Sequence, residues 1–318
     1  MVPFSDNMKV ALIHNPNAFQ GESASGEMRR LFERAGHEVC QVSTEESNWH
    51  RVISESNVRV IIVGGDGTVQ SVVPHLRKTK IPFNILACGT ANNIAQCLGQ
   101  TSNAELLAAQ IDNAEIRALD IGTVECGRSS NIFVEAAGMG IFAELIFQMR
   151  QWPKQTKMER AESREEKFTR ALEELRSICK RQQGAVLELK VDDTIIADRF
   201  LLVALMNLEL IGPKLRLAPG ADSGDGYLDL ICIREGERRH LTQWLDDQSP
   251  GDSAAASFKA LRCRRVELWQ NASARIHVDS QLIEEPEFPL VLKVEPGALR
   301  YGVIKVRGGL LRNQIRLH

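Results

Sequence analysis

Short apolar runs alternate with helix-like stretches through the first 120 residues of the chain. The run Val58 to Val63 is rich in β-branched apolar residues, which is typical of a strand buried in a parallel sheet. Turn residues and helically spaced apolar residues separate such runs, so we expect βαβ units in a layered α/β domain. The predicted strands are 9–13, 38–43, 58–63 and 83–86, and the predicted helices are 23–35, 47–56 and 68–76.

The pattern changes after about Leu119. Strand-like stretches separated by turn residues then dominate, which favours a mostly antiparallel second domain. The charged stretch from Lys154 to Gln183 interrupts this pattern, and its apolar residues predict an amphipathic helix with a solvated face. Those residues are Phe168, Leu172, Leu175 and Ile178. The predicted strands are 116–125, 131–137, 185–191, 200–205, 227–233, 265–269 and 275–278.

Composition narrows the class of protein. Hydrophobic residues make up 43% of the chain, charged residues 25%, and the net charge is −2, so we expect a soluble globular protein that does not bind nucleic acid. The seven cysteines have no metal-site or redox spacing, which favours a reducing compartment. The N-terminus lacks the pattern of a signal peptide, and the longest apolar run, Phe200 to Met206, is too short to span a membrane. We therefore expect a cytoplasmic protein that meets membranes only at their surface.

The sharpest motif is Gly64-Gly65-Asp66-Gly67-Thr68, which directly follows the buried strand. Glycines let backbone N–H groups approach a phosphate, and the start of the following helix adds partial positive charge. Asp66 can hold a metal ion or a reacting hydroxyl beside that phosphate. A tight turn without a ligand is the simpler alternative, but the position after a buried strand favours phosphate binding. No Gly-Lys-Ser/Thr follows, and residue 70 is Gln, so neither a Walker A nor a dinucleotide fingerprint fits.

A second glycine turn follows the next predicted strand, at Gly89-Thr90 before Asn92-Asn93. Because the carboxyl ends of parallel strands face one crevice, two such turns could hold one nucleotide. Taken alone, this segment is better explained as a helix cap at Thr90 with solvated asparagines.

In this order, the two motifs resemble the paired GGDGT and GTxND motifs of the diacylglycerol-kinase catalytic family, which includes bacterial lipid kinases and sphingosine kinases. GGDGT alone also occurs in NAD kinases and phosphofructokinases, so the ordered set is the more specific signal. Further segments that resemble the family are Asn15-Pro16, Leu119 to Gly122, Glu135 to Ala143, Leu217 to Asp229 and Val294 to Arg300.

The resemblance implies a fold and a reaction. It implies an α/β N-terminal nucleotide-binding domain over residues 1–120, completed by a C-terminal tail at 297–318. It also implies a mostly antiparallel β-sandwich C-terminal domain at 121–296 that binds the lipid. The implied reaction transfers the γ-phosphoryl group of ATP to a lipid hydroxyl at the membrane surface, with Mg²⁺. A homodimer stays open.

The resemblance also implies roles for individual residues. Asp66 and Asp120 would organise the catalytic magnesium and its water network, and Gln281 stands at the position of the general base. A second, structural metal would be surrounded by Asp222, Asp225 and Tyr227, the outer two acting through backbone oxygens. The implied ATP contacts are Asn15, Ser43, Gly64, Gly65, Asp66, Gly67, Thr68, Gly89, Thr90 and Asn92.

Two positions depart from the family pattern. Asn93 replaces the Asp of the second motif, and Gln281 stands where the family usually has the Glu that is assigned as general base. An amide is far too weak a base near neutral pH. Asp66 could take over the role, as in the sphingosine-kinase branch, whereas Glu284 and Glu285 fit an exposed turn better. Two alternatives to an active lipid kinase therefore stay open: a nucleotide- or lipid-binding regulator, and an enzyme resembling NAD kinases.

Overall fold

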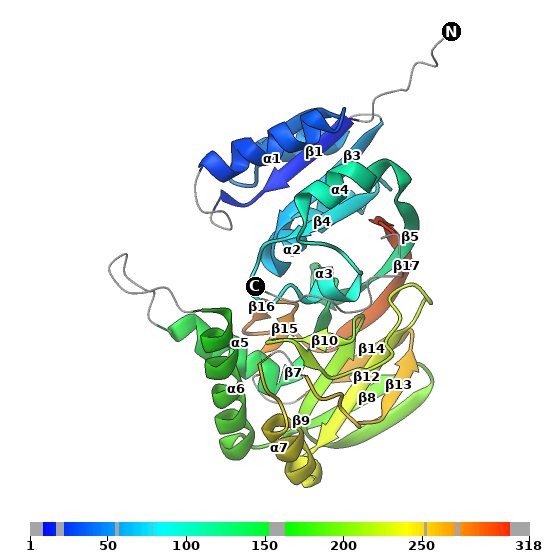
Figure 1. The fold of residues 1–318 in the computed structure, drawn as a ribbon. Coiled ribbons are helices and arrows are strands. Elements are labelled where there is room, and N and C mark those ends of the chain that lie inside the picture. The colour runs from blue at the N-terminus through cyan, green and yellow to red at the C-terminus, as the bar shows by residue number, and fades with distance from the viewer. Residues whose placement is uncertain are drawn as a thin grey trace. The chain divides into compact units, whose positions relative to one another are not determined.

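The computed structural model describes residues 9–16, 22–54, 57–77, 79–152, 163–250, 253–270 and 274–305. The chain divides into two compact units, residues 1–119 with 297–318, and residues 120–296. The two long strands β5 (Glu115–Cys126) and β17 (Leu290–Val303) each contribute residues to both units. Figure 1 shows the elements of each unit.

The first unit is built on a parallel sheet with strand order β17-β4-β3-β1-β2. All seven residues of β3 are buried, as expected for a central strand covered on both faces. Helices α1 and α4 supply Phe32 and Leu107 to one face, and α2 packs against β3. The elements are β1 (Lys9–His14), α1 (Glu22–Arg34), β2 (Glu38–Ser43), η2 (Trp49–Ser54), β3 (Val58–Gly64), α2 (Asp66–Leu76), β4 (Phe83–Ala87), α3 (Asn93–Cys97), α4 (Ala104–Gln110) and η3 (Ile111–Asn113).

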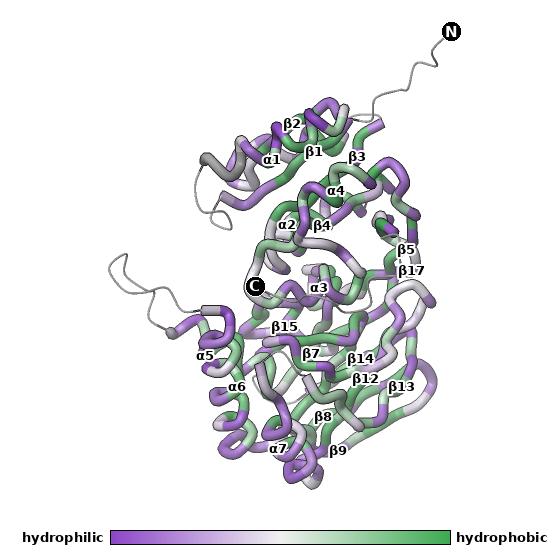
Figure 2. The backbone as a smooth tube through the Cα atoms, viewed as in Figure 1, coloured by the Kyte–Doolittle hydropathy of each residue, from purple (hydrophilic) through white to green (hydrophobic). Residues whose placement is uncertain are grey.

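The second unit is a set of antiparallel strands that meet at the long strand β9 (Thr194–Met206). The first half of β9 pairs with β8, and its second half runs between β7 and β12. Its apolar half, Phe200 to Met206, is fully buried and forms part of a green segment in Figure 2. The predicted α/β domain and mostly antiparallel β-sandwich are therefore confirmed.

The other strands of the second unit are β6 (Ser129–Phe133), β7 (Ala136–Gly140), β8 (Ala185–Val191), β10 (Leu210–Ile211), β11 (Leu215–Arg216), β12 (Leu228–Arg234), β13 (Ala260–Cys263), β14 (Arg265–Trp269), β15 (Ile276–Val278) and β16 (Gln281–Ile283). Its helices are α5 (Ile141–Gln151), α6 (Arg164–Arg181), η4 (Glu235–Glu237) and α7 (Arg238–Asp246). The strand expected over 131–137 is in fact two strands, β6 and β7, separated at Val134-Glu135.

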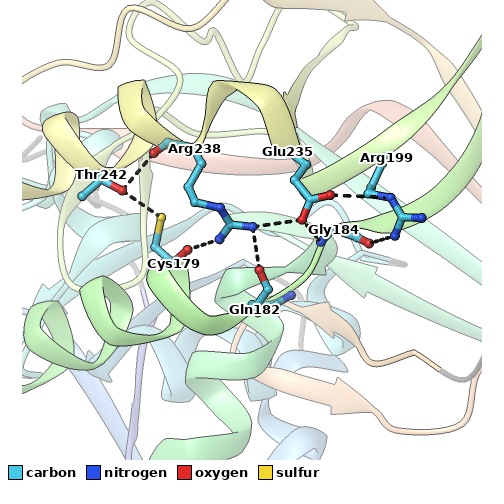
Figure 3. Close-up of polar contacts among 7 residues, drawn as sticks. All are labelled: Cys179, Gln182, Gly184, Arg199, Glu235, Arg238 and Thr242. Atoms are coloured by element: carbon cyan, nitrogen blue, oxygen red, sulfur yellow. Dashed lines mark hydrogen bonds and ion pairs between the residues drawn. The ribbon is translucent and has the colours of Figure 1, made fainter.

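Helices cover one face of this second unit, around a core that includes Leu172, Leu175 and Ile178 of α6. The amphipathic helix expected within 154–183 is therefore present as α6, which begins with a capping box at Ser163. At its other end, Arg238 of α7 donates to the carbonyl oxygens of Cys179 and Gln182, the latter at 2.8 Å (Figure 3). A cation at this end also suits the helix dipole, so Arg238 joins α7 to α6.

Candidate functional site

The glycine turn after β3 leads directly into α2, as the sequence predicts. Gly65 is the residue before the helix and has extended backbone angles, with φ −101° and ψ −169°, and no side chain caps the helix start. The N–H groups of Thr68 and Val69 donate to the carbonyl of Gly65 at 3.0 and 3.1 Å. These two bonds close the first turn of α2, and the helix start places partial positive charge at the carboxyl edge of the sheet.

The second glycine turn packs against the first. A Cβ atom on Gly65 would lie 2.8 Å from Cα of Gly89, and one on Gly89 would lie 2.4 Å from Cα of Gly65. Cys88 N–H donates to the carbonyl of Gly64 at 3.0 Å, which ties the two turns together. Both glycines are therefore required by the close approach of two backbones.

Asp66 joins these turns through its side chain. Its Oδ1 accepts the N–H of Ile94 at 2.9 Å, at the start of α3. Burial raises the pKa of Asp66, while hydrogen bonds from the backbone of Ile94, Asn93 and Asn92 oppose that rise. The carboxylate thus caps α3 across the two turns.

Asn92 closes the second turn. Its backbone is left-handed, with φ 56°, and its side chain makes two hydrogen bonds to Gly89, accepting from N–H at 2.8 Å and donating to the carbonyl at 2.9 Å. Thr90 is exposed in this turn. Asn residues tolerate this backbone conformation better than most, which explains the residue type.

The predicted contacts lie at the ends of the neighbouring strands: Asn15 follows β1, and Ser43 is the last residue of β2. Asn15 N–H donates to the carbonyl of Val63 at 3.4 Å, and Ser43 Oγ accepts the N–H of Glu45 at 3.2 Å. In the sheet, His14 stands beside both Ser43 and Val63. The ends of four adjacent parallel strands therefore bring together the residues predicted to bind ATP.

His14 is a candidate that the sequence analysis did not single out. Its Nδ1 atom is buried without a hydrogen-bond partner, and burial lowers the pKa of His14, opposed by the nearby charge of Glu46. The available signal was its position, the last residue of a strand directly before the Asn-Pro turn. A neutral imidazole here offers a hydrogen bond to a ligand at the strand ends.

This edge of the first unit suits a nucleotide. A Cβ atom on Gly67 would meet nothing within 4 Å, unlike one on Gly65. The N–H groups of α2's first turn could hold phosphates, and Asp66 could face their metal ion.

In the second unit, Asp120 is tied to the segment that follows β11. It is 2% exposed, and its Oδ2 accepts the N–H of Gly226 at 2.7 Å. Its backbone N–H donates to the carbonyl oxygen of Ser223 at 2.6 Å, and its own carbonyl oxygen accepts from Nδ2 of Asn207 at 2.9 Å. The structure therefore brings Asp120 together with the acidic loop, residues 220–227, that contains Asp222 and Asp225.

The carboxylates of the acidic loop accept hydrogen bonds from the loop itself and from an arginine. Asp222 Oδ1 accepts the N–H of Gly224 at 3.0 Å, and Asp225 Oδ1 accepts that of Tyr227 at 2.9 Å. The other oxygen of Asp225 is 2.5 Å from the guanidinium of Arg262. Among the described residues, no group of three His, Cys, Asp or Glu side chains could hold a metal ion.

Gln281 is exposed at the start of β16, in a hairpin whose turn is held by Asp279. The carboxylate of Asp279 accepts the N–H groups of Val134, Glu135 and Ala136 at 2.8–3.2 Å. Glu135 is buried, and its Oε1 accepts the N–H of Gly212 at 3.2 Å. A buried carboxylate therefore lies in the segment that the Gln281 hairpin anchors. The family resemblance included it in the segment Glu135 to Ala143 but gave it no role.

Two family models match most of the chain. The diacylglycerol kinase catalytic domain matches residues 9–124, and the YegS C-terminal NAD kinase beta sandwich-like domain matches residues 155–303. A diacylglycerol kinase of Mycobacterium tuberculosis (strain ATCC 25618 / H37Rv) is 26% identical over 247 residues, covering 73% of this chain and 75% of the relative.

Solved structures share the fold. A crystal structure of a diacylglycerol kinase from Bacillus anthracis str. Sterne superposes with a TM-score of 0.71 at 18% identity, covering 95% of this chain and 98% of that one. A second structure from the same organism reaches a TM-score of 0.72 at 19% identity, with coverages of 96% and 99%. The two matched domains, in the predicted order, identify the chain as a member of the diacylglycerol kinase catalytic family.

Proposed function

We propose that the protein transfers the γ-phosphoryl group of ATP to the hydroxyl group of a diacylglycerol-like lipid. The observation that carries the proposal is the pair of interlocked glycine turns, in which Gly65 and Gly89 touch and Asp66 caps α3. Family membership supports a lipid kinase as the general class. The acceptor lipid, the nucleotide and the metal ion are parts of the proposal.

In the proposed reaction, the first unit binds ATP. Backbone N–H groups at the start of α2 hold its phosphates, and the open side of Gly67 leaves room for their approach. Bound Mg²⁺ supplies neutralisation of phosphate charge during transfer. Asp66 fixes the relative position of the two turns through its hydrogen bond to Ile94 N–H. Such positioning is the main contribution that a protein makes to phosphoryl transfer.

The proton of the acceptor hydroxyl needs a base other than Gln281, because an amide cannot take it up near neutral pH. Asp66 is the carboxylate of the first unit to test for this role. Burial raises the pKa of Asp66, which makes its carboxylate a stronger base than an exposed aspartate.

Radiolabel transfer from [γ-³²P]ATP tests the proposal. The acceptors are diacylglycerol, sphingoid bases, phosphatidylglycerol and NAD. We expect label in diacylglycerol or in a lipid with a similar free hydroxyl group, and none in NAD. Label in NADP would instead support the NAD-kinase alternative, which the description of the second matched domain motivates. ATP binding without transfer to any acceptor would support a regulatory protein.

Asp66→Asn separates the charge of Asp66 from its capping role. Asparagine keeps an oxygen that can accept the N–H of Ile94, so we expect folding to survive. Loss of the carboxylate should lower kcat at least 100-fold, as is typical of an acid–base group. Asp66→Ala is the comparison, because it removes both functions and should also lower the thermal midpoint. Wild-type turnover in Asp66→Asn would exclude a chemical role for this carboxylate.

A further inference from the structure

Three carboxylates lie in the acidic loop or directly after it. Asp222 and Asp225 lie in the loop, and Asp229 follows in β12. Like charges grouped along so short a segment are stabilised by a neighbouring cation.

The antiparallel sheet places an arginine at this point. Strand β13 pairs with β12, and Arg262 stands directly opposite Asp229 in the register. From there its guanidinium reaches Asp225 Oδ2 at 2.5 Å. The side chains of Arg262 and Asp225 are 56% and 29% exposed, so the pair lies at the surface of the unit.

An aromatic ring holds the guanidinium in place. Cζ of Arg262 lies 4.4 Å from the centroid of the Tyr227 ring, and Cζ of Arg264 lies 4.5 Å from it. Stacking on an aromatic face restricts a planar guanidinium to one orientation. Tyr227 therefore contributes its ring to an arginine, although the family resemblance implied a contribution of its backbone oxygen to a metal ion.

We propose that Arg262 supplies the positive charge of the acidic loop and takes the place of a divalent cation there. A hard cation takes six or more oxygen ligands, waters included, and the one side chain that the resemblance implies as a ligand, that of Asp225, already accepts hydrogen bonds with both oxygens. A metal ion bound to Asp225 would also stand close to the guanidinium and be repelled by it. The loop therefore folds without metal.

Thermal unfolding in the absence of nucleotide tests this. The wild-type protein is dialysed against EDTA, and its midpoint is then measured with and without millimolar MgCl₂ or CaCl₂. We expect the same midpoint in every condition. Arg262→Ala should lower the midpoint in EDTA by about 2–4 °C, and either cation should restore it by binding the vacated carboxylate.

Two further variants complete the experiment. Arg234→Ala is the matched control, because Arg234 forms a comparably exposed ion pair with Asp198 at 2.7 Å outside the loop. It should show no response to either cation. Arg262→Lys keeps the charge but loses the planar stack, and we expect it to stay independent of metal.

Several results would overturn the proposal. One equivalent of magnesium or calcium retained by the wild type after dialysis, found by elemental analysis, would show that a metal binds. So would a higher wild-type midpoint with either cation but not with an equal ionic strength of NaCl. An unchanged midpoint of Arg262→Ala in EDTA would show that the loop needs no cation. If the midpoint of Arg262→Ala is lowered, neither cation restores it, and Arg262→Lys has the same lowered midpoint, then Arg262 stabilises the loop by stacking and not by its charge. None of these midpoints or metal analyses depends on kinase activity.

Discussion

At the scale of single residues, the glycines of the first turn differ in what surrounds them. A Cβ atom on Gly65 would collide with the backbone of Gly89, whereas one on Gly67 would meet nothing within 4 Å. The first glycine therefore serves the packing of two turns. In the proposed nucleotide site, Gly67 leaves room for the ligand to approach.

Two alanine substitutions separate these roles. Gly65→Ala should lower the free energy of unfolding by about 1–3 kcal/mol, the usual cost of overpacking. Gly67→Ala should leave stability near that of the wild type, or raise it, because alanine favours a helix by up to about 1 kcal/mol. It should nevertheless weaken ATP binding, since a methyl group would face the phosphates. Urea denaturation and calorimetric titration with ATP measure the two effects. Equal stabilities of the two variants would contradict the assignment.

The buried imidazole of His277 predicts a dependence of stability on pH. Burial lowers the pKa of His277 from 6.5 to about 4, although a hydrogen bond to the backbone of Asp279 partly opposes it. Because the unfolded chain takes up this proton first, the contribution is complete above pH 6.5 and is lost as the pH falls towards 4. At about 1.4 kcal/mol for each pKa unit, the loss amounts to a few kcal/mol.

Urea unfolding of wild type and His277→Gln at several pH values checks this. The variant should lose stability less steeply over that range, whatever its absolute stability. Parallel curves would show that His277 does not cause the acid sensitivity.

At the scale of elements, the strongly patterned segments were predictable from sequence and the context-dependent ones were not. β3 and α6 follow directly from a β-branched run and from helical spacing. The sequence-based prediction omitted α5, whose first residues Ile141 and Phe142 favour strands as much as helices. It also missed α7, although Leu241, Trp244 and Leu245 have helical spacing there.

Likewise, the spacing of GGDGT predicted a phosphate loop but not that Asp66 caps a helix 28 positions further along the chain. Arg262 could not be assigned from sequence either, since its place beside Asp229 depends on the pairing of β12 with β13. Contacts of this kind require the sheet register.

The junction of α6 with α7 gives a prediction for these two helices. The guanidinium of Arg238 donates hydrogen bonds to the carbonyl oxygens of Cys179 and Gln182 at the end of α6. It also lies 3.0 Å from Glu235 Oε1. Arg238→Ala should lower the free energy of unfolding by about 1–3 kcal/mol, because charged hydrogen bonds to carbonyls are lost. Arg239→Ala is the control, since that neighbouring side chain is exposed. Equal midpoints in chemical denaturation would mean that the cap adds no stability.

At the scale of the whole molecule, the end of β17 completes the sheet of the first unit. Tyr301 pairs with Phe83 in parallel, and Gly302 O accepts from Asn84 Nδ2 at 2.7 Å and from Gln100 Nε2 at 2.8 Å. Asn84 is 1% exposed.

Among the residues that the structure describes, no helix combines the length and apolar character needed to cross a membrane.

Asn84→Ala should therefore loosen β17. The substitution removes one of the two donors to the carbonyl oxygen of Gly302. It also removes the Oδ1 atom that accepts a hydrogen bond from Arg59 at 3.4 Å. The free energy of unfolding should therefore fall by about 1–3 kcal/mol. Hydrogen exchange followed by mass spectrometry should show faster exchange over residues 299–303. Asn113→Ala, at an exposed asparagine, is the control. Unchanged exchange in Asn84→Ala would show that this amide does not hold the strand.

The position of β17 in the chain also sets an order of events during synthesis. A ribosome makes residues 120–296 before it makes the Tyr301 segment that pairs with β4. The second unit can thus be complete while Phe83 of the nascent β4 still lacks its pairing with Tyr301. An unpaired strand position can pair with another chain, so a chain released before residue 301 is made would be prone to aggregate. Translation of the last strand is the step that seals it.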